Sequence, residues 1–198
     1  MSAPGMDSRA VGAMALAALL VAVYEGTHGF ADQWCQGDGD ARDKRRFGDQ
    51  QVYLSDGALV ADTPARPGAR TCTETQRGWF AAIRHAFSYE AVQVAATLAA
   101  TRTCGYRVPV PALLAGAVIN ATTHAVIDRG PVFQWLAAKF NKAEYLERAT
   151  VVRTPDGPAC PNGPGTAWIE LDAALHEVIG VGSALVRTAI ALRFGRCR

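Results

Sequence analysis

The sequence predicts an all-α protein, an up-down bundle of four long helices and one short helix with a small β-hairpin in an inserted loop. Long apolar segments rich in Ala and Leu exceed the usual length of a strand and favour helix. Polar or Pro/Gly-rich stretches separate them, which is typical of helices joined by loops. With 49% hydrophobic and 19% charged residues, the composition excludes disorder over most of the chain. At 198 residues, we expect a single helical domain over residues 1–198.

The predicted helices follow the apolar segments in order. The four long helices are expected at residues 9–35, 74–102, 109–128 and 169–194. Pro109 and Pro111 stand at the start of the third, where proline is tolerated because the first amides of a helix lack partners. The short helix, 131–148, opens on Pro131 directly after Gly130.

Two insertions interrupt the helical pattern. Residues 36–77 form a polar insertion, in which the turn sequence 55–57 between two apolar runs predicts a hairpin over 52–60. We expect this insertion to be a lid over a site. Residues 150–167 are rich in proline and glycine, which predicts a loop with at most short strands.

The charge balance argues against a nucleic-acid partner. Lys plus Arg total 20 and Asp plus Glu total 18, so the net charge is only +2. The basic cluster 42–46 is short, contains an acid and lacks interleaved aromatic residues for base stacking. We therefore interpret it as the solvated face of a loop.

The cysteines indicate a reducing environment. Their odd number and the lack of a C-x-x-C pair exclude a zinc ribbon or finger and a complete disulfide framework. Reduced thiols of a cytoplasmic protein are the better interpretation. The five are Cys35, Cys72, Cys104, Cys160 and Cys197.

The apolar segments leave membrane association open. The uncharged run 11–24 is shorter than the roughly 20 apolar residues that span a bilayer, and it fits a buried core helix. The segments 108–127 and 173–194 are apolar but carry polar residues, among them Asn120 and Arg187. We interpret them as core helices of a soluble or peripheral protein. Several membrane spans remain an alternative, because polar groups facing a bundle interior build sites in membrane proteins.

Three of the four histidines have an aspartate four residues away. Such spacing puts both side chains on one face of a helix, where they can chelate a metal ion or orient each other. In an up-down bundle, the helix order brings all four histidines to one end, where facing helices build metal sites. The alternative is that each pair is a satisfied structural hydrogen bond. The pairs are His28/Asp32, His124/Asp128 and Asp172/His176, and the remaining histidine is His85.

The order of these motifs resembles a family of uncharacterised helical proteins of actinobacteria and phages, allied to the membrane-bound metal-dependent hydrolases. The resemblance covers roughly residues 20–195. It rests on matched residues from six places: His28, Asp32 and Gln36; Lys44; Gly78 and Trp79; His85, Ser88 and Tyr89; the run 123–129; and the run 171–176.

The resulting hypothesis is a metal-dependent hydrolase. Imidazole and carboxylate ligands suit Zn, Mn or Fe without choosing among them. His85 and Asp172 are the candidate catalytic residues, and Lys44 and Arg129 are candidates to bind an anionic group such as phosphate on a small-molecule or lipid-like substrate. For these two cations, ordinary solvated charges are the alternative. The candidate metal ligands are His28, Asp32, His124, Asp128, Asp172 and His176.

A second hypothesis comes from a different class of protein. It is a non-enzymatic, membrane-associated or interaction protein of a phage or mobile element, in which the His–Asp pairs are structural. In that case the insertion 36–77 carries the binding surface. Metal content distinguishes the two hypotheses, because only the first predicts a bound ion.

Overall fold

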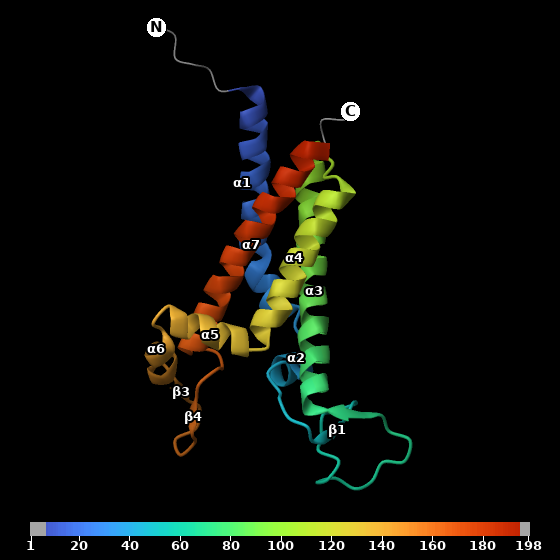
Figure 1. The fold of residues 1–198 in the computed structure, drawn as a ribbon, viewed down its shortest axis with the longest axis vertical. Helices are drawn as coiled ribbons and strands as arrows, with labels where there is room; N and C mark the ends of the chain where they lie inside the picture. The colour runs from blue at the N-terminus through green and yellow to red at the C-terminus, as the bar shows by residue number, and fades with distance from the viewer. Residues whose placement is uncertain (1–6, 195–198) are drawn as a thin grey trace. The chain divides into compact units, whose positions relative to one another are not determined.

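The computed structural model describes residues 7–194 and is built mainly of helices, which confirms the predicted all-α class (Figure 1). Two small antiparallel strand pairs accompany the helices. The helices are α1 (Ser8–Gly29), continued by the π-helix η1 (Phe30–Trp34), α2 (Asp38–Asp43), α3 (Glu74–Thr103), α4 (Val110–Asp128), α5 (Pro131–Lys139), α6 (Ala143–Arg148) and α7 (Ala167–Phe194). The strands are β1 (Gln51–Tyr53), β2 (Thr71–Thr73), β3 (Val151–Val152) and β4 (Ala159–Cys160).

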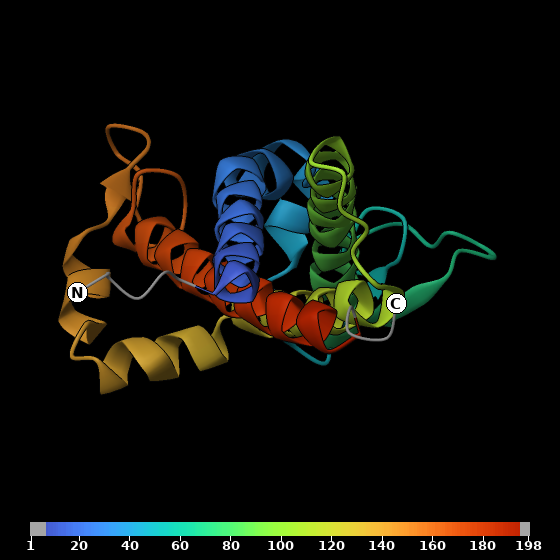
Figure 2. The same cartoon turned by 90° about the horizontal axis from the view of Figure 1, so that it is seen from above.

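The predicted short helix 131–148 is two helices. Gly130, at φ 99°, directly precedes Pro131, and α5 runs from there to Lys139. Asn141 then takes a φ of 61°, a left-handed conformation that a helix cannot continue through, and α6 begins at Ala143. Figure 2 shows α5 and α6 in yellow and orange, followed by the β3–β4 hairpin.

The insertion contains more structure than the sequence indicated. It begins with the unpredicted helix α2, and the strand at the start of the predicted hairpin is present as β1. A tight turn follows, in which the Tyr53 amide donates to the Ala58 carbonyl at 2.9 Å, and Val52 forms a single bridge with Leu59. The main partner of β1 is β2, however, with Val52 opposite Cys72. In Figure 1 a long loop leads from β1 to β2, which directly precedes α3.

The chain forms two compact units. Among the described residues, unit 1 comprises 7–35, 87–122 and 177–194, and unit 2 comprises 36–86 and 123–176. In unit 1, Leu16, Leu20 and Tyr24 of α1 share a hydrophobic core with Ala184 and Ala191 of α7.

Unit 1 also buries an ion pair among its apolar helices. Arg187 is fully buried and donates to the Glu90 carboxylate at 3.2 Å and to the Thr97 hydroxyl at 3.0 Å. The Asn120 amide donates to the same carboxylate at 2.7 Å. Gly116 leaves the room that this guanidinium needs, because a Cβ at that position would overlap it. Hydrogen bonding thus compensates for the burial of these charges.

Within residues 7–194, three helical segments are long and apolar enough to cross a membrane: α1 with η1, α4 and α7. On α4, Val110, Leu114 and Val118 follow one another at intervals of four residues and are 60–64% exposed. An exposed apolar stripe of this kind is uncommon on a soluble monomer.

Candidate metal centre

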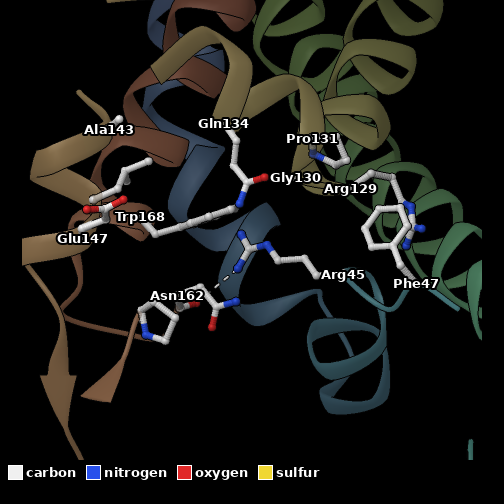
Figure 3. A pocket seen from close by; sticks show the side chains of 12 residues that line it. Arg45, Phe47, Arg129, Gly130, Pro131, Gln134, Ala143, Glu147, Asn162 and Trp168 are labelled. Atoms are coloured by element: carbon white, nitrogen blue, oxygen red, sulfur yellow. Dashed lines mark hydrogen bonds between the residues drawn. The ribbon is translucent and has the colours of Figure 1, made fainter. Parts of the chain in front are cut away.

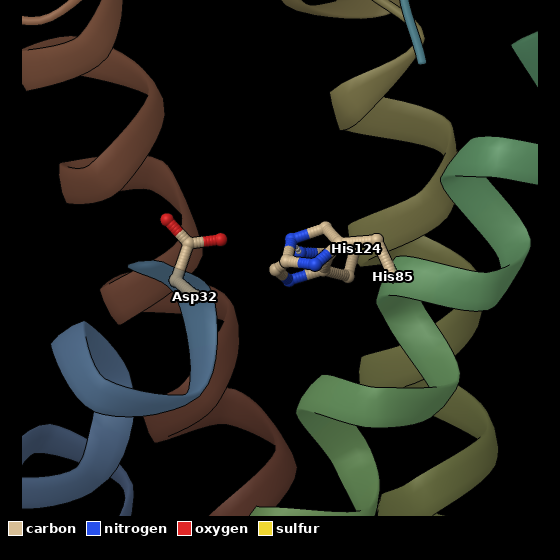
Figure 4. A group of neighbouring side chains, drawn as sticks. All are labelled: Asp32, His85 and His124. Carbon is tan, nitrogen blue, oxygen red and sulfur yellow. Dashed lines mark hydrogen bonds between the residues drawn. The ribbon is translucent and has the colours of Figure 1, made fainter. Parts of the chain in front are cut away.

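Three histidines and one aspartate from three helices meet in unit 2. His85 lies on α3, His124 and Asp128 lie one turn apart on α4, and His176 lies on α7. All four side chains are at most 2% exposed. Figure 4 shows the imidazole rings of His85 and His124 next to each other, on the same side of the two helices that carry them, with ring centroids 4.8 Å apart. The expected convergence of histidines is therefore present for these residues.

The Oδ2 atom of Asp128 stands at the centre of the cluster. It lies 3.4 Å from Nε2 of His85 and 3.4 Å from Nε2 of His124. These two nitrogens are 2.9 Å apart. The ring of His176 stacks on that of His124 with centroids 4.1 Å apart. One ligand atom from each of His124, Asp128 and His176 lies within 4.8 Å of the others, so the three can hold one ion.

Two consecutive cations pair with one carboxylate of the cluster and with another beside it. Lys44 donates to Oδ1 of Asp128 at 2.9 Å, and Arg45 donates to Oδ2 of Asp172 at 3.3 Å. Lys44 is 6% exposed, so it is not an ordinary solvated charge. Both cations come from the insertion, directly after α2. The interpretation of cluster 42–46 as a solvated loop face was therefore wrong for these residues.

Asp43 fixes this part of the insertion. Its buried carboxylate accepts a 2.6 Å hydrogen bond from Arg77 of α3 and lies 3.7 Å from Arg46. Arg77 also donates to the carbonyls of Tyr53 and Leu54 next to the β-hairpin. The insertion is thus tied to α3 on both sides of Lys44.

Arg129, which follows the cluster aspartate on the chain, is also buried. Its Nη1 donates to the Lys44 carbonyl at 2.6 Å, and its guanidinium lies 3.8 Å from the Phe47 ring centroid and 5.2 Å from that of Trp79. Burial lowers the pKa of the Arg129 guanidinium from its ordinary value. Gly78 allows this close packing, because a Cβ there would overlap Nη1 of Arg129 and the Arg46 carbonyl.

Asp172 lies beside the cluster, and the other predicted ligands, His28 and Asp32, belong to the other compact unit. Oδ1 of Asp172 is buried without a hydrogen-bond partner among residues 7–194. In unit 1, His28 Nδ1 lies 3.0 Å from the Tyr89 hydroxyl, and Asp32 sits on the π-helix η1. That His28 and Asp32 join the metal centre stays a prediction.

Sequence reasoning missed Arg45 and Trp168. The Arg45 guanidinium packs 5.0 Å from the Trp168 ring centroid. The position of Arg45 next to the predicted Lys44 could have indicated its role. Nothing in the sequence singled out Trp168. The cysteines play no part in this cluster: Cys35, Cys72, Cys104 and Cys160 are free thiols, and Cys197 lies outside the described residues.

The fold and this cluster define a helical protein with a buried His/Asp site. No protein-family model, curated protein or solved structure matches the chain.

Proposed function

We propose that unit 2 binds a divalent metal ion and uses it to hydrolyse an anionic substrate. The spacing of the ligand atoms supports this proposal. Two nitrogens, each about 2.05 Å from a tetrahedral zinc ion, lie about 3.3 Å apart. The 3.4 Å separations of Asp128 Oδ2 from the His85 and His124 nitrogens match that spacing. The two nitrogens themselves are 2.9 Å apart, so an ion held by both would need them to separate by a few tenths of an ångström.

In this proposal His124, Asp128 and His176 hold the ion, and His85 supplies a fourth nitrogen. Lys44 orients the carboxylate through its other oxygen, which is the usual arrangement of an outer partner around a metal ligand. The bound ion would lower the pKa of a water molecule and polarise the group to be cleaved. Asp172 is the candidate general base, because its buried Oδ1 is an acceptor without a partner among the described residues.

Metal content tests the first half of the proposal. We expect about one equivalent of Zn, Mn or Fe in the untagged, full-length protein, measured by plasma mass spectrometry. His124→Ala should remove the metal. Thr122→Ala, at an exposed position on the same helix, is the matched control and should retain it. A folded wild-type protein that takes up no ion even when metal is supplied would refute the proposal. The non-enzymatic alternative would then stand.

Activity tests the second half. We expect the metal-loaded protein to hydrolyse a chromogenic phosphoester and Asp172→Asn to retain the metal but lose most of the rate. If Asp172→Asn leaves the rate unchanged, Asp172 is not the base. If the loaded protein turns over no phosphoester or other hydrolysable anion, the cluster is not a hydrolytic site.

A specific observation also favours membrane association. The exposed stripe Val110, Leu114 and Val118 lies on a helix of 19 residues, which spans about 28 Å. The hydrocarbon core of a bilayer is about 30 Å thick. We therefore propose that lipid covers this face of α4.

Extraction tests the membrane proposal. The protein should stay with the membrane fraction through a high-salt and an alkaline carbonate wash and leave it in detergent. Leu114→Glu should weaken insertion, since a carboxylate in the bilayer interior is costly. Gln134→Glu, exposed on α5, adds the same charge outside the candidate spans and should have no effect. Release of the wild-type protein by salt alone would contradict the proposal.

A further inference from the structure

Unit 2 contains a cavity of about 590 Å³ next to the His/Asp cluster. It lies between the segment after α2, the start of α5, α6 and the start of α7. Figure 3 shows Arg45 extending toward Asn162 and Trp168, and Arg129 lying against the Phe47 ring. Neither the cluster ligands nor the proposed hydrolysis account for these lining residues.

Three residues that line the cavity carry buried hydrogen-bond donors. Nε of Arg45, Nε and Nη2 of Arg129 and Nε1 of Trp168 are buried and have no hydrogen-bond partner within residues 7–194. Arg129 is 2% and Trp168 8% exposed, so water does not readily satisfy these donors. Guanidinium and indole nitrogens donate and cannot accept. A ligand that pairs with them must therefore bring acceptor oxygens.

The charged residues at the cavity indicate that this ligand is an anion. Two guanidinium groups line the cavity, and its one lining carboxylate, Glu147, belongs to an exposed residue. The planar guanidinium fork matches the paired oxygens of a phosphate or carboxylate. The ring faces of Phe47 and Trp168 hold the two guanidinium groups in position.

The remaining lining residues are largely apolar. Pro131, Ala143 and Leu146 line the same cavity as the two arginines. An inorganic ion alone would leave this surface uncovered. An anionic group attached to an apolar body would contact both kinds of wall.

The same arginines connect the cavity to the cluster. Arg45 donates to Asp172, the candidate base, and Arg129 donates to the carbonyl of Lys44, whose ammonium group holds Asp128. A ligand bound by these two side chains therefore lies next to the groups proposed to cleave it.

We propose that this cavity binds a phosphoryl group carried on an apolar body, with Arg45, Arg129 and Trp168 donating to its oxygens. That the bound phosphoester is the substrate rests on the proposed hydrolytic function. The binding itself does not, because it needs no metal ion.

Calorimetry on full-length protein, freed of metal and then of chelator, tests the site with three probes. Inorganic phosphate should bind, n-butyl phosphate should bind more tightly, and butanol should not bind. Dihexanoyl phosphatidic acid, below its micelle concentration, is the third probe. If it binds more tightly than butyl phosphate, the source of the phosphoryl group is a lipid, and if more weakly, a soluble phosphoester.

Variants assign the binding to this cavity. Arg45→Gln and Arg129→Gln should each weaken butyl phosphate binding about tenfold or more. Trp168→Phe keeps the ring and removes only the N–H donor, and it should weaken binding several-fold. Arg148→Gln, on the exposed face of α6, is the matched control and should bind as the wild type does. Arg129→Lys, which keeps the charge, shows whether a loss follows from the fork geometry or from unfolding, with the melting temperature measured alongside.

Binding that is absent in the wild type, or unchanged in Arg45→Gln and Arg129→Gln, would overturn the proposal. These outcomes are separable from those of the metal test. A chain with metal but without phosphate binding retains the metal centre and loses this inference. A chain with phosphate binding but without metal retains the anion site and loses the hydrolase.

Discussion

The substitution Gly78→Ala has two opposing effects on the stability of the protein. Alanine in a helix interior is favoured over glycine by about 1 kcal/mol, so propensity alone predicts a more stable protein. The new Cβ, however, would overlap Nη1 of Arg129 and the Arg46 carbonyl. Overpacking of this kind costs about 1–3 kcal/mol, and here one obstacle is backbone, which yields less easily than a flexible side chain. We expect net destabilisation of about 1–2 kcal/mol.

For a chain of this length, such a loss lowers Tm by about 2–8 °C, which differential scanning calorimetry in detergent can measure. Gly182→Ala is the matched control, because a Cβ there meets nothing within 4 Å and propensity should raise Tm by about 1–4 °C. Gly78→Ala should also weaken butyl phosphate binding, since Arg129 must move. A Tm for Gly78→Ala at or above that of the wild type would refute the close packing of α3 against Arg129.

Three further predictions concern other residues. Lys44→Met should lower metal affinity about 10- to 100-fold by removing the outer partner of Asp128, whereas an unchanged affinity in metal titration would contradict that role. Arg187→Met should cost about 3–5 kcal/mol in chemical unfolding, because Glu90 is left buried without its cation. Adding Glu90→Gln should recover most of that loss, and no recovery would contradict the ion pair. Asn141→Ala should destabilise by about 1 kcal/mol, and Asn141→Gly by less, because only glycine adopts the left-handed conformation freely; equal melting temperatures for the two variants would count against it.

The long helices could be predicted from sequence because their cause is local. Each is a long Ala/Leu-rich run, and proline marks the starts of α4 and α5. The break between α5 and α6 was missed because Asn141 is a weaker left-handed signal than glycine. The partner of β1 was missed for a different reason. Thr71–Thr73 lies far along the chain from β1, and three residues carry too little alternation to set a register.

The residues of the candidate site also include some that the sequence predicted and some that it did not. Spacing of four placed His124 and Asp128 on one helix face, and the order of the helices suggested that His85 and His176 would join them. The roles of Arg45 and Trp168 depend instead on contacts between segments more than a hundred residues apart. Burial also distinguishes Lys44 from its neighbour Arg42, and that difference follows from packing rather than from sequence pattern.

The Lys44–Asp128 ion pair raises the strongest objection to a metal ion, since an ammonium group already neutralises the carboxylate. This objection does not hold, because the two oxygens of Asp128 have different partners. Oδ1 accepts from Lys44 at 2.9 Å, while Oδ2 lies 3.4 Å from two imidazole nitrogens. The 3.4 Å separations leave Oδ2 at the distance of a fellow ligand from each nitrogen, with Lys44 on the other oxygen of the carboxylate. The two nitrogens, 2.9 Å apart, would have to separate by a few tenths of an ångström around the ion.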